Sequence, residues 1–418
     1  MKASEDLFYT KHFCILPWIH FHSWPDGKVF PCCMADSSSP LTKVEEHFSL
    51  LDMMNSEKFN ELRLRMLNDQ PSDICKRCYD VELFGTWSLR QSFNTNYGIK
   101  NLPQVALTNA DGSLNKFELQ YMDIRFSNIC NMKCRSCGPS CSSQWAIEYR
   151  DRYGEARLRD RFGLEKIVVS SNENGSFWQK LKPHLLEVNE VYFAGGEALI
   201  TPEHYKILDY WLENNKTNVQ LSYTTNFSVL NYKNRNVLDY WKKFKHVELY
   251  ASIDAGGPLA EFMRKGTDWE QIEENVRIIQ KEVPHVRFEI TPTISIWNLH
   301  QFPTFHKDWI EKGFLSKQGG IRLNILTNPW FSSILVLPEF YKERIEKTYW
   351  EVYNDHSYSE DIRNAYLVVL NTMKSGTENK EGVREFFNFN KELDDVRKEQ
   401  IFDYAPELRE VYEWSLID

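Results

Sequence analysis

Apolar runs alternate with longer amphipathic stretches between residues 117 and 330, and this alternation is the strongest pattern in the chain. Six apolar runs have the length and the β-branched or aromatic content of strands, and several alternate polar with apolar positions. These runs are residues 117–127, 188–193, 219–225, 247–253, 286–295 and 321–326. Between them, apolar positions recur with the helical period and predict helices near 142–161, 177–186, 203–214, 236–245, 269–282 and 303–312.

Strands that alternate with helices predict βαβ units and a parallel sheet. Two helix starts support this pattern: Thr201 and Pro202 suit the N-cap and the first helical position, and Thr267 with Glu270 is a candidate capping box. Because crossovers between parallel strands are right-handed, six such units curl into an open barrel. The predicted fold class is α/β, with a partial (β/α)6 TIM-like barrel whose functional groups lie at the C-terminal ends of the strands.

The segments on either side of the barrel differ from it in composition. Residues 1–95 are rich in cysteine and include a helical stretch near 56–67, while Asn, Gly, Pro and Asp in residues 96–116 indicate a linker. Residues 331–418 carry helical patterns, among them 338–352 and 359–373. We therefore predict four segments: a small N-terminal cysteine-rich cluster domain (1–95), a linker (96–116), the barrel (117–330) and a helical C-terminal extension (331–418).

Composition and charge exclude several classes of protein. Hydrophobic residues make up 42% of the 418 positions and aromatic residues 14%, which is enough to build a core and excludes wholesale disorder. With 59 acidic and 50 basic residues the net charge is −9, which argues against a nucleic-acid partner. The chain has neither the run of about 18 apolar residues that a membrane span needs nor an N-terminal signal peptide. We therefore expect a cytoplasmic protein without a membrane partner.

The nine cysteines fall into two groups, which is typical of metal binding rather than of disulfides in a cytoplasmic protein. Cys130, Cys134 and Cys137 form a CxxxCxxC motif directly after the first predicted strand. Three thiolates at this spacing suit a [4Fe–4S] cluster and leave one of its four irons without a protein ligand. Zinc is the alternative at this stage.

The N-terminal cysteines predict a second, closed site. Asp26-Gly27 is a strong hairpin signal that would bring Cys14 near Cys32. Cys75 and Cys78 follow as a CxxC pair. Four thiolates in two pairs fit either zinc or a fully ligated [4Fe–4S] cluster, and the spacing does not choose between them.

Glycine and polar signals also follow the next strands. Gly195-Gly196-Glu197 comes after the second strand, Thr225-Asn226 after the third, and Ser252 and Asp254 stand at the end of the fourth. Because the C-terminal ends of parallel strands meet at one face of a barrel, we expect these groups to surround the CxxxCxxC motif.

Together these motifs resemble those of the radical S-adenosylmethionine (SAM) enzymes, over about residues 117–330. The matching pieces are the CxxxCxxC motif, Ala194-Gly195-Gly196-Glu197-Ala198, Tyr223-Thr224-Thr225-Asn226, Ala251-Ser252-Ile253-Asp254, Phe262-Met263-Arg264-Lys265-Gly266 and the stretch from Thr293 to Asn298. The resemblance implies that Cys130, Cys134 and Cys137 hold the cluster and that SAM chelates the open iron. It also implies a SAM site, with the methionine amino group at Gly195, Gly196 and Glu197, the carboxylate at Arg264, the ribose at Ser252 with Asp254 or Asn226, and Thr225 and Asn298 as further SAM-side residues.

The N-terminal region resembles the auxiliary-cluster region of the SPASM and twitch subgroups of that superfamily. The resemblance rests on the spacing Cys14…Gly27…Cys32 and on Cys75-xx-Cys78, and it implies one auxiliary [4Fe–4S] cluster. Cys33 is an alternative to Cys32, although the Gly-x4-Cys spacing favours Cys32. In the subgroups this region normally follows the barrel, whereas here it precedes it.

The resemblance implies an enzyme that cleaves SAM reductively to a 5′-deoxyadenosyl radical and abstracts hydrogen from a substrate. A peptide or protein substrate comes first by subgroup precedent, with the auxiliary cluster assisting electron transfer. A dehydrogenase or epimerase of a small sugar or aminocyclitol is the alternative. An electron donor such as flavodoxin or ferredoxin is the expected partner, and no residue is assigned to catalysis beyond the cofactor ligands. A non-catalytic protein with structural zinc sites is a second alternative, which the Gly-Gly-Glu motif and Arg264 argue against.

Overall fold

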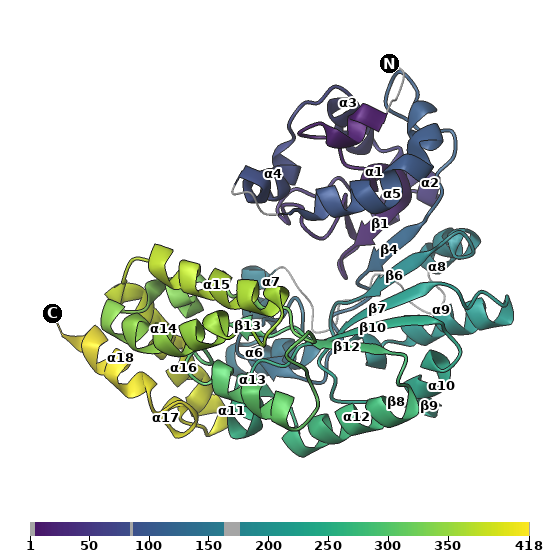
Figure 1. Cartoon of the computed structure of the whole chain (residues 1–418). Coiled ribbons are helices and arrows are strands. Elements are labelled where there is room, and N and C mark those ends of the chain that lie inside the picture. The colour runs from purple at the N-terminus through teal and green to yellow at the C-terminus, as the bar shows by residue number, and fades with distance from the viewer. Residues whose placement is uncertain (1–4, 84–86, 163–175, 418) are drawn as a thin grey trace. The chain divides into compact units, whose positions relative to one another are not determined.

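The computed structural model describes residues 5–83, 87–162 and 176–417, and Figure 1 shows its helices and strands. The chain divides into two compact units. The first contains Met1–Ile129, Ile167–Ser222 and Lys243–His246, and the second contains Cys130–Lys166, Tyr223–Lys242 and Val247–Asp418. In the described residues, eight strands belong to one mostly parallel sheet with many helices around it, so the predicted α/β fold class is confirmed.

The cysteine-rich N-terminal region shares its sheet with the first strands of the predicted barrel. Within the first unit the strand order is β6-β4-β1-β2-β3. Strand β4 (Tyr121–Ile124) pairs in parallel with both β6 (Glu190–Phe193) and β1 (His20–Ser23). A turn with Gly27 at φ 78° then brings β2 (Lys28–Phe30) antiparallel to β1, which confirms the predicted hairpin.

Helices cover both faces of these strands. On one face, Phe177 of α8 (Ser176–Leu181) lies with its ring centroid 6.0 Å from that of Phe21. On the opposite face, Phe93 of α5 (Leu89–Ala106) lies 4.7 Å from the Tyr121 ring. The other elements of this unit are η1 (Glu5–Tyr9), α1 (Leu16–Ile19), β3 (Thr42–Lys43), η2 (Val44–Glu46), α2 (Leu50–Met54), α3 (Glu57–Leu67), η3 (Asp73–Cys75), α4 (Lys76–Leu83), η4 (Lys182–His184), η5 (Ala198–Ile200) and α9 (Pro202–Glu213).

Helix α5 extends into the segment that the sequence predicts to be a linker, so residues 96–106 are helical. Its start is fixed by a capping box in which the Ser88 hydroxyl accepts from the Gln91 amide and the Gln91 side chain accepts from the Ser88 amide. Gly98 is needed for packing, because a Cβ there would lie 2.8 Å from the Phe8 ring. Composition alone suggests a linker here because Asn and Gly usually mark loops. In α5 these residues lie on the buried face of the helix instead.

In the second unit, β10 (His246–Ala251) pairs in parallel with β12 (Arg287–Ile290). Strand β13 (Thr293–Ile294) pairs in parallel with β14 (Asn324–Ile325). The predicted strand 286–295 is therefore split, and Pro292, which has no N–H to donate, lies at the break. Strand β7 (Gln220–Thr225) has residues in both units.

The remaining helices follow the predicted positions closely. One start differs: the N-cap of α12 (Trp269–Glu282) is Asp268, whose side chain accepts from the Gln271 amide, so the predicted Thr267 box is wrong by one residue. The C-terminal extension is helical as predicted (Figure 1). This unit also contains β5 (Lys133–Cys134), α6 (Ser143–Tyr153), α7 (Glu155–Phe162), β8 (Asn231–Tyr232), β9 (Arg235–Asn236), α10 (Val237–Trp241), α11 (Gly257–Met263), β11 (Arg264–Lys265), α13 (Phe302–Glu311), η6 (Trp330–Ser332), η7 (Ile334–Val336), α14 (Glu339–Asn354), α15 (Glu360–Ser375), α16 (Lys380–Arg397), α17 (Ile401–Tyr404) and α18 (Leu408–Leu416).

Among the described helices, none combines the length and the apolar character that crossing a bilayer requires.

Candidate iron–sulfur and S-adenosylmethionine sites

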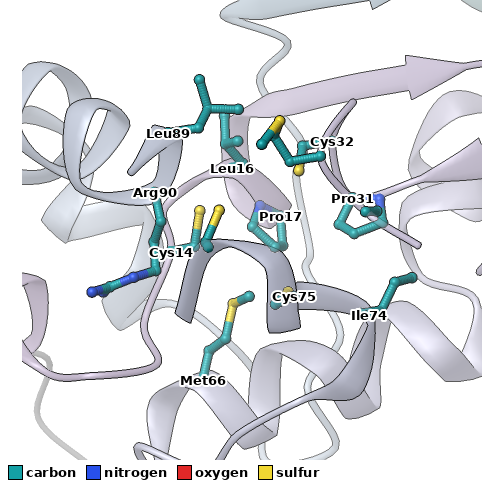
Figure 2. A pocket seen from close by; sticks show the side chains of 13 residues that line it. Cys14, Leu16, Pro17, Pro31, Cys32, Met66, Ile74, Cys75, Leu89 and Arg90 are labelled. Carbon is teal, nitrogen blue, oxygen red and sulfur yellow. The ribbon is translucent and has the colours of Figure 1, made fainter. Parts of the chain in front are cut away.

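Four N-terminal cysteines line one pocket in the first unit (Figure 2). Cys14 precedes α1, Cys32 follows β2, Cys75 ends η3 and Cys78 lies in α4. Cys33, the alternative to Cys32, does not line this pocket. The other walls of the pocket are Leu16, Pro17, Pro31, Met34, Ala35, Met66, Ile74, Leu89 and Arg90.

The thiols of this pocket need a cation if they are to ionise. Burial raises the pKa of Cys14 and Cys32, and it raises that of Cys75 to about 12, with a further contribution from Cys78. Ionising all four would place like charges together in apolar surroundings. Metal cations remove that repulsion, so the donor set fits a closed four-thiolate metal site. In the described part of the chain, no three His, Cys, Asp or Glu side chains are grouped around a single-ion position.

Cys33 lies in a different electrostatic environment. Burial raises its pKa to about 12, and the nearby Asp123 carboxylate adds to the shift. Asp123 is fully buried, and its Oδ2 lies 3.0 Å from Nδ1 of His22. Trp24 Nε1 donates to His22 Nε2 at 3.1 Å, so Nδ1 of His22 carries the proton. Arg125 lowers the pKa of Cys33 and so acts against burial and Asp123.

Helix α5 holds the chain on both sides of Cys14. Arg90 is 5% exposed, and its Nη1 donates to the Phe13 carbonyl at 2.7 Å while its Nε donates to Glu82 Oε1 at 2.9 Å. Asn94 Nδ2 donates to the Phe13 carbonyl at 3.0 Å, and its Oδ1 accepts from the Ile15 amide at 2.9 Å. Sequence patterns did not predict either residue, because nothing local to α5 indicates that it packs on a segment about eighty residues earlier.

The CxxxCxxC cysteines belong to one loop of the second unit. Cys130, Met132 and Cys134 form a buried cluster against which Cys137 packs. The loop contains β5, which pairs antiparallel with β11 so that Cys134 lies opposite Arg264. The structure therefore brings the three predicted cluster cysteines together and places the predicted carboxylate-binding arginine beside one of them.

Arg264 is held in an ion pair with the buried Asp254. Its Nε donates to Asp254 Oδ2 at 2.7 Å, and its Nη1 lies 3.7 Å from Cys134 Sγ. The other Asp254 oxygen accepts from the Thr293 amide at 2.8 Å. Burial alone would lower the pKa of Arg264, but Asp254 and Cys134 raise it, so the guanidinium remains a cation. A cation fixed beside a cluster cysteine suits an anionic ligand of that cluster.

The motifs after the third and fourth strands also lie at this loop. Asn226 Nδ2 lies 3.8 Å from Cys130 Sγ and donates to Asn131 Oδ1 at 2.9 Å. Thr225 Oγ1 accepts from the Phe227 amide at 3.0 Å, and the Thr225 carbonyl accepts from the Ser252 amide at 2.8 Å. Asn226 therefore lies next to Cys130, and Ser252 is joined to its neighbour Thr225 through the backbone.

Asn298 supports Asp254 rather than standing free. Its Oδ1 accepts from the amide and the hydroxyl of Ser295, and its Nδ2 donates to the carbonyls of Asp254 and Thr293. The side-chain amide of Asn298 is fully buried and is already used in these four bonds. Its direct contact with SAM stays a prediction.

The Gly-Gly-Glu motif forms a tight turn in the first unit. Gly195 and Gly196 have φ values of 84° and 45°, a region that favours glycine. A Cβ on Gly196 would lie 2.3 Å from the Ile129 carbonyl oxygen. The Glu197 amide donates to that same oxygen at 2.7 Å. The turn thus packs on the residue that precedes Cys130, and this close approach requires the glycine independently of SAM.

Cys141 is exposed and lies two residues before α6. The α6 helix starts at Ser143 because the Ser142 hydroxyl accepts from the Trp145 amide as its N-cap. Contact with the Cys141 thiol is the first cause that raises the pKa of Cys137, ahead of burial.

Comparison with known proteins gives a match in the N-terminal region. Residues 14–79 match the family model SPASM, which is described as an iron–sulfur cluster-binding domain. No curated protein matches the chain.

Several solved structures are partly similar. "Native anSMEcpe with bound AdoMet and Cp18Cys peptide" is 18% identical with a TM-score of 0.37, over 56% of this chain and 60% of that one. "Native anSMEcpe with bound AdoMet" is 17% identical with a TM-score of 0.39, over 56% and 60%. "Structure of TYW1 with a lysine-pyruvate adduct bound" is 17% identical with a TM-score of 0.23, over 43% and 57%. The match spans about three fifths of the length of the first of these structures, and TM-scores below 0.5 carry no functional argument.

Proposed function

We propose that the chain is a radical SAM enzyme, and its N-terminal match to the SPASM iron–sulfur cluster-binding domain at residues 14–79 supports this. We propose that it cleaves SAM reductively to methionine and a 5′-deoxyadenosyl radical, which abstracts hydrogen from a substrate. A peptide or protein is the proposed substrate, and the auxiliary [4Fe–4S] cluster assists electron transfer.

The observation that carries this proposal is the convergence of distant motifs on the cysteine sulfurs. Asn226 lies at Cys130 Sγ, and Arg264 lies at Cys134 Sγ with Asp254 behind it. When bound, the reduced cluster supplies the electron that breaks a C–S bond of SAM. Cys130, Cys134 and Cys137 would hold the cluster and leave one iron for SAM.

The other residues would bind and orient SAM. Arg264 would donate to the SAM carboxylate with the N–H groups that Asp254 does not occupy. The turn at Gly195 and Gly196 would receive the amino group, and Ser252 would act on the ribose together with Asn226 or Asp254.

The N-terminal pocket would hold the auxiliary cluster through Cys14, Cys32, Cys75 and Cys78. Because all four irons would have protein ligands, this cluster would accept or relay an electron rather than bind SAM. A flavodoxin or ferredoxin is the proposed electron donor. A cytoplasmic location is proposed because thiols remain reduced there.

The substrate class rests on the subgroup alone. Radical SAM proteins with SPASM or twitch regions modify peptides, protein side chains, sugars or aminocyclitols, so a small-molecule dehydrogenase or epimerase is the second candidate. A protein with two structural zinc sites is the third, but it has no use for a partly buried arginine beside a cluster cysteine.

Anaerobic reconstitution with iron and sulfide tests the proposal. We expect the wild-type protein with SAM and dithionite to release 5′-deoxyadenosine, detected by mass spectrometry, and the Cys130→Ala variant to release none. Stoichiometric zinc in the purified protein, with no iron uptake on reconstitution, would contradict the proposal.

A further inference from the structure

A charged side chain is buried inside the three-cysteine loop. Arg135 lies between Cys134 and Cys137 and is 0% exposed. Its Nε donates to the Phe262 carbonyl at 3.2 Å, and its guanidinium carbon lies 3.6 Å from the centre of the Phe262 ring. The guanidinium is therefore shielded from water, and its charge must be balanced by the protein.

The balancing groups come from the C-terminal extension. Arg135 Nη1 donates to Asn390 Oδ1 at 2.9 Å, and Nη2 bonds both to Asp394 Oδ1 and to Glu399 Oε2, the latter at 2.9 Å. Asn390 and Asp394 are four residues apart on α16 and so present their side chains on one face of the helix. Trp297 Nε1 also donates to Asn390 Oδ1, at 2.8 Å, which fixes that amide. One guanidinium thus joins the cysteine loop to a segment more than 250 residues later in the chain.

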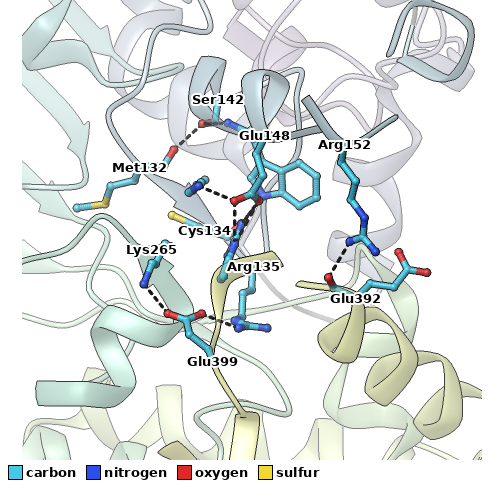
Figure 3. A network of polar contacts seen from close by, with 12 residues as sticks. Met132, Cys134, Arg135, Ser142, Glu148, Arg152, Lys265, Glu392 and Glu399 are labelled. Atoms are coloured by element: carbon cyan, nitrogen blue, oxygen red, sulfur yellow. Dashed lines mark hydrogen bonds and ion pairs between the residues drawn. The ribbon is translucent and has the colours of Figure 1, made fainter. Parts of the chain in front are cut away.

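Two more contacts tie the same regions together. Lys265, the neighbour of Arg264 on β11, pairs with Glu399 Oε1 at 2.6 Å. Figure 3 shows Lys265 and Arg135 at the same Glu399 carboxylate. Lys133 on β5 pairs with Glu148, which in turn accepts from Arg397 Nη2 at 2.8 Å. Both strands that carry the cluster and SAM-binding residues are therefore anchored to the segment Asn390–Glu399.

A loop of this kind needs such an anchor. Its one short strand pairs only two residues with β11, so the backbone ladder fixes little of its conformation. Breaking a buried ion pair by removing one partner leaves an uncompensated charge, so the alternative loop conformations are strongly disfavoured. Hydrophobic residues in place of a buried ion pair often stabilise a fold equally well. Net stability alone therefore gives little reason for these pairs. This favours a role in fixing one conformation.

We propose that the segment Asn390–Glu399 fixes the geometry of the three-cysteine loop through Arg135, which is a positioning residue for the site-differentiated cluster. That this loop holds the SAM-binding cluster rests on the proposed function, whereas its anchoring through Arg135 does not. The C-terminal extension therefore sets the relative positions of Cys134 and Arg264, and with them the fit of the SAM carboxylate.

Amide hydrogen exchange in the metal-free protein tests the anchoring itself. Arg135→Gln keeps a hydrogen-bonding side chain but loses the charge and the fork. We expect exchange in peptides that span residues 130–142 to become about tenfold faster or more, because local opening no longer breaks two charged contacts. Arg344→Gln is the matched control, since Arg344 forms an exposed pair with Glu410 in the same extension. Equal exchange in wild type, Arg135→Gln and Arg344→Gln overturns the proposal.

The reconstituted protein tests the consequence for the cluster. In Arg135→Gln we expect the electron paramagnetic resonance signal of the SAM-binding cluster to broaden or shift. We also expect its response to SAM to require about tenfold more SAM. Arg135→Lys should recover part of the response, and the auxiliary cluster should be unchanged. An unaltered signal and SAM response in Arg135→Gln would overturn the positioning role.

Failure of the proposed function can be distinguished from failure of the anchoring. If the wild-type protein takes up no iron, the proposed function fails, and hydrogen exchange still decides the anchoring. If Arg135→Gln does not fold, Glu399→Gln removes only one of the two carboxylates and should give the same changes at smaller size. A wild-type exchange pattern in a folded Glu399→Gln variant together with a wild-type SAM response would then overturn the proposal.

Discussion

The two cysteine sites differ in the residues that surround them and in what each would have to bind. The four-cysteine pocket of the first unit has mainly apolar walls, and its one lining cation, Arg90, is bonded to Glu82 and to backbone carbonyls. The three-cysteine loop of the second unit has Lys133, Arg135 and Arg264 within or beside it. A closed site needs only a rigid enclosure, whereas an open one must also admit and orient a charged ligand.

The difference is visible at the thiols. Burial raises the pKa of Cys75 in the closed pocket, and the neighbouring Cys78 raises it further. Burial also raises the pKa of Cys134 in the open loop, but there Arg264 acts in the opposite direction. Arg90 acts in that direction on Cys75 as well, but in the open loop Arg264 also has its Nη1 3.7 Å from Cys134 Sγ. Removing a residue should accordingly harm one site without harming the other.

The largest expected effect is loss of the open site. In a variant with alanine at Cys130, Cys134 and Cys137, SAM cleavage should be abolished, because no ligand remains for the cluster. Iron should fall from about eight to about four per chain if both sites hold [4Fe–4S] clusters. Iron and sulfide analysis after anaerobic reconstitution measures this. A loss of all iron would show that the closed site depends on the open one.

The next effect separates two adjacent cysteines of the closed site. Cys32→Ala should lose the auxiliary cluster because Cys32 lines the pocket, whereas Cys33→Ala should retain it because Cys33 does not line it. Iron content and the auxiliary-cluster signal decide between them, with SAM binding as the control that should stay unchanged. The reverse result would move the ligand by one residue, and equal loss would give Cys33 a role of its own.

The third effect concerns the enclosure of the closed site. Arg90→Met removes the partner of Glu82 and the donor that holds the Phe13 carbonyl next to Cys14. Breaking such a buried pair costs about 3–5 kcal/mol. We expect the free energy of unfolding to fall by about that amount in urea titrations, and the auxiliary iron to be lost while SAM binding persists. A variant with normal auxiliary iron would show that the cysteine positions do not depend on the bonds from Arg90 to Glu82 and to the Phe13 carbonyl.

Local sequence patterns predicted the helices and strands but not the side-chain contacts that hold them together. Five of the six predicted strands and the residues at their C-terminal ends are where alternation and motif spacing place them, because both are local properties. The pair of Arg135 with Asp394 was not predicted, since an arginine in a loop gives no indication of a partner far away in the chain. The bond from Arg90 to the Phe13 carbonyl was missed because nothing local to α5 indicates contact with a segment 77 residues earlier. The split at Pro292 and the helical start of the linker were missed for a related reason: both depend on how backbone groups are used in the folded sheet and core.

The smallest effect belongs to Arg264, and it tests whether the cation of the open site is there for SAM. A charge-assisted bond from its guanidinium to the SAM carboxylate is worth about 1.5–3 kcal/mol. Arg264→Ala should therefore weaken SAM binding by roughly 10- to 150-fold, at about 1.4 kcal/mol per tenfold. Arg264→Lys should fall between, because it keeps the charge and loses the planar fork. Titration of SAM into the reconstituted variants measures this.

Arg264 is also the partner of the buried Asp254, so its removal will lower stability as well as affinity. The double variant Arg264→Met, Asp254→Asn removes both charges, and Asn can still accept from the Thr293 amide that Asp254 now binds. We expect its unfolding free energy to recover while its SAM affinity stays low, with Asp254→Asn alone showing how much of the loss belongs to the carboxylate. If affinity recovers together with stability, Arg264 serves the fold of the loop, and the SAM carboxylate must bind elsewhere.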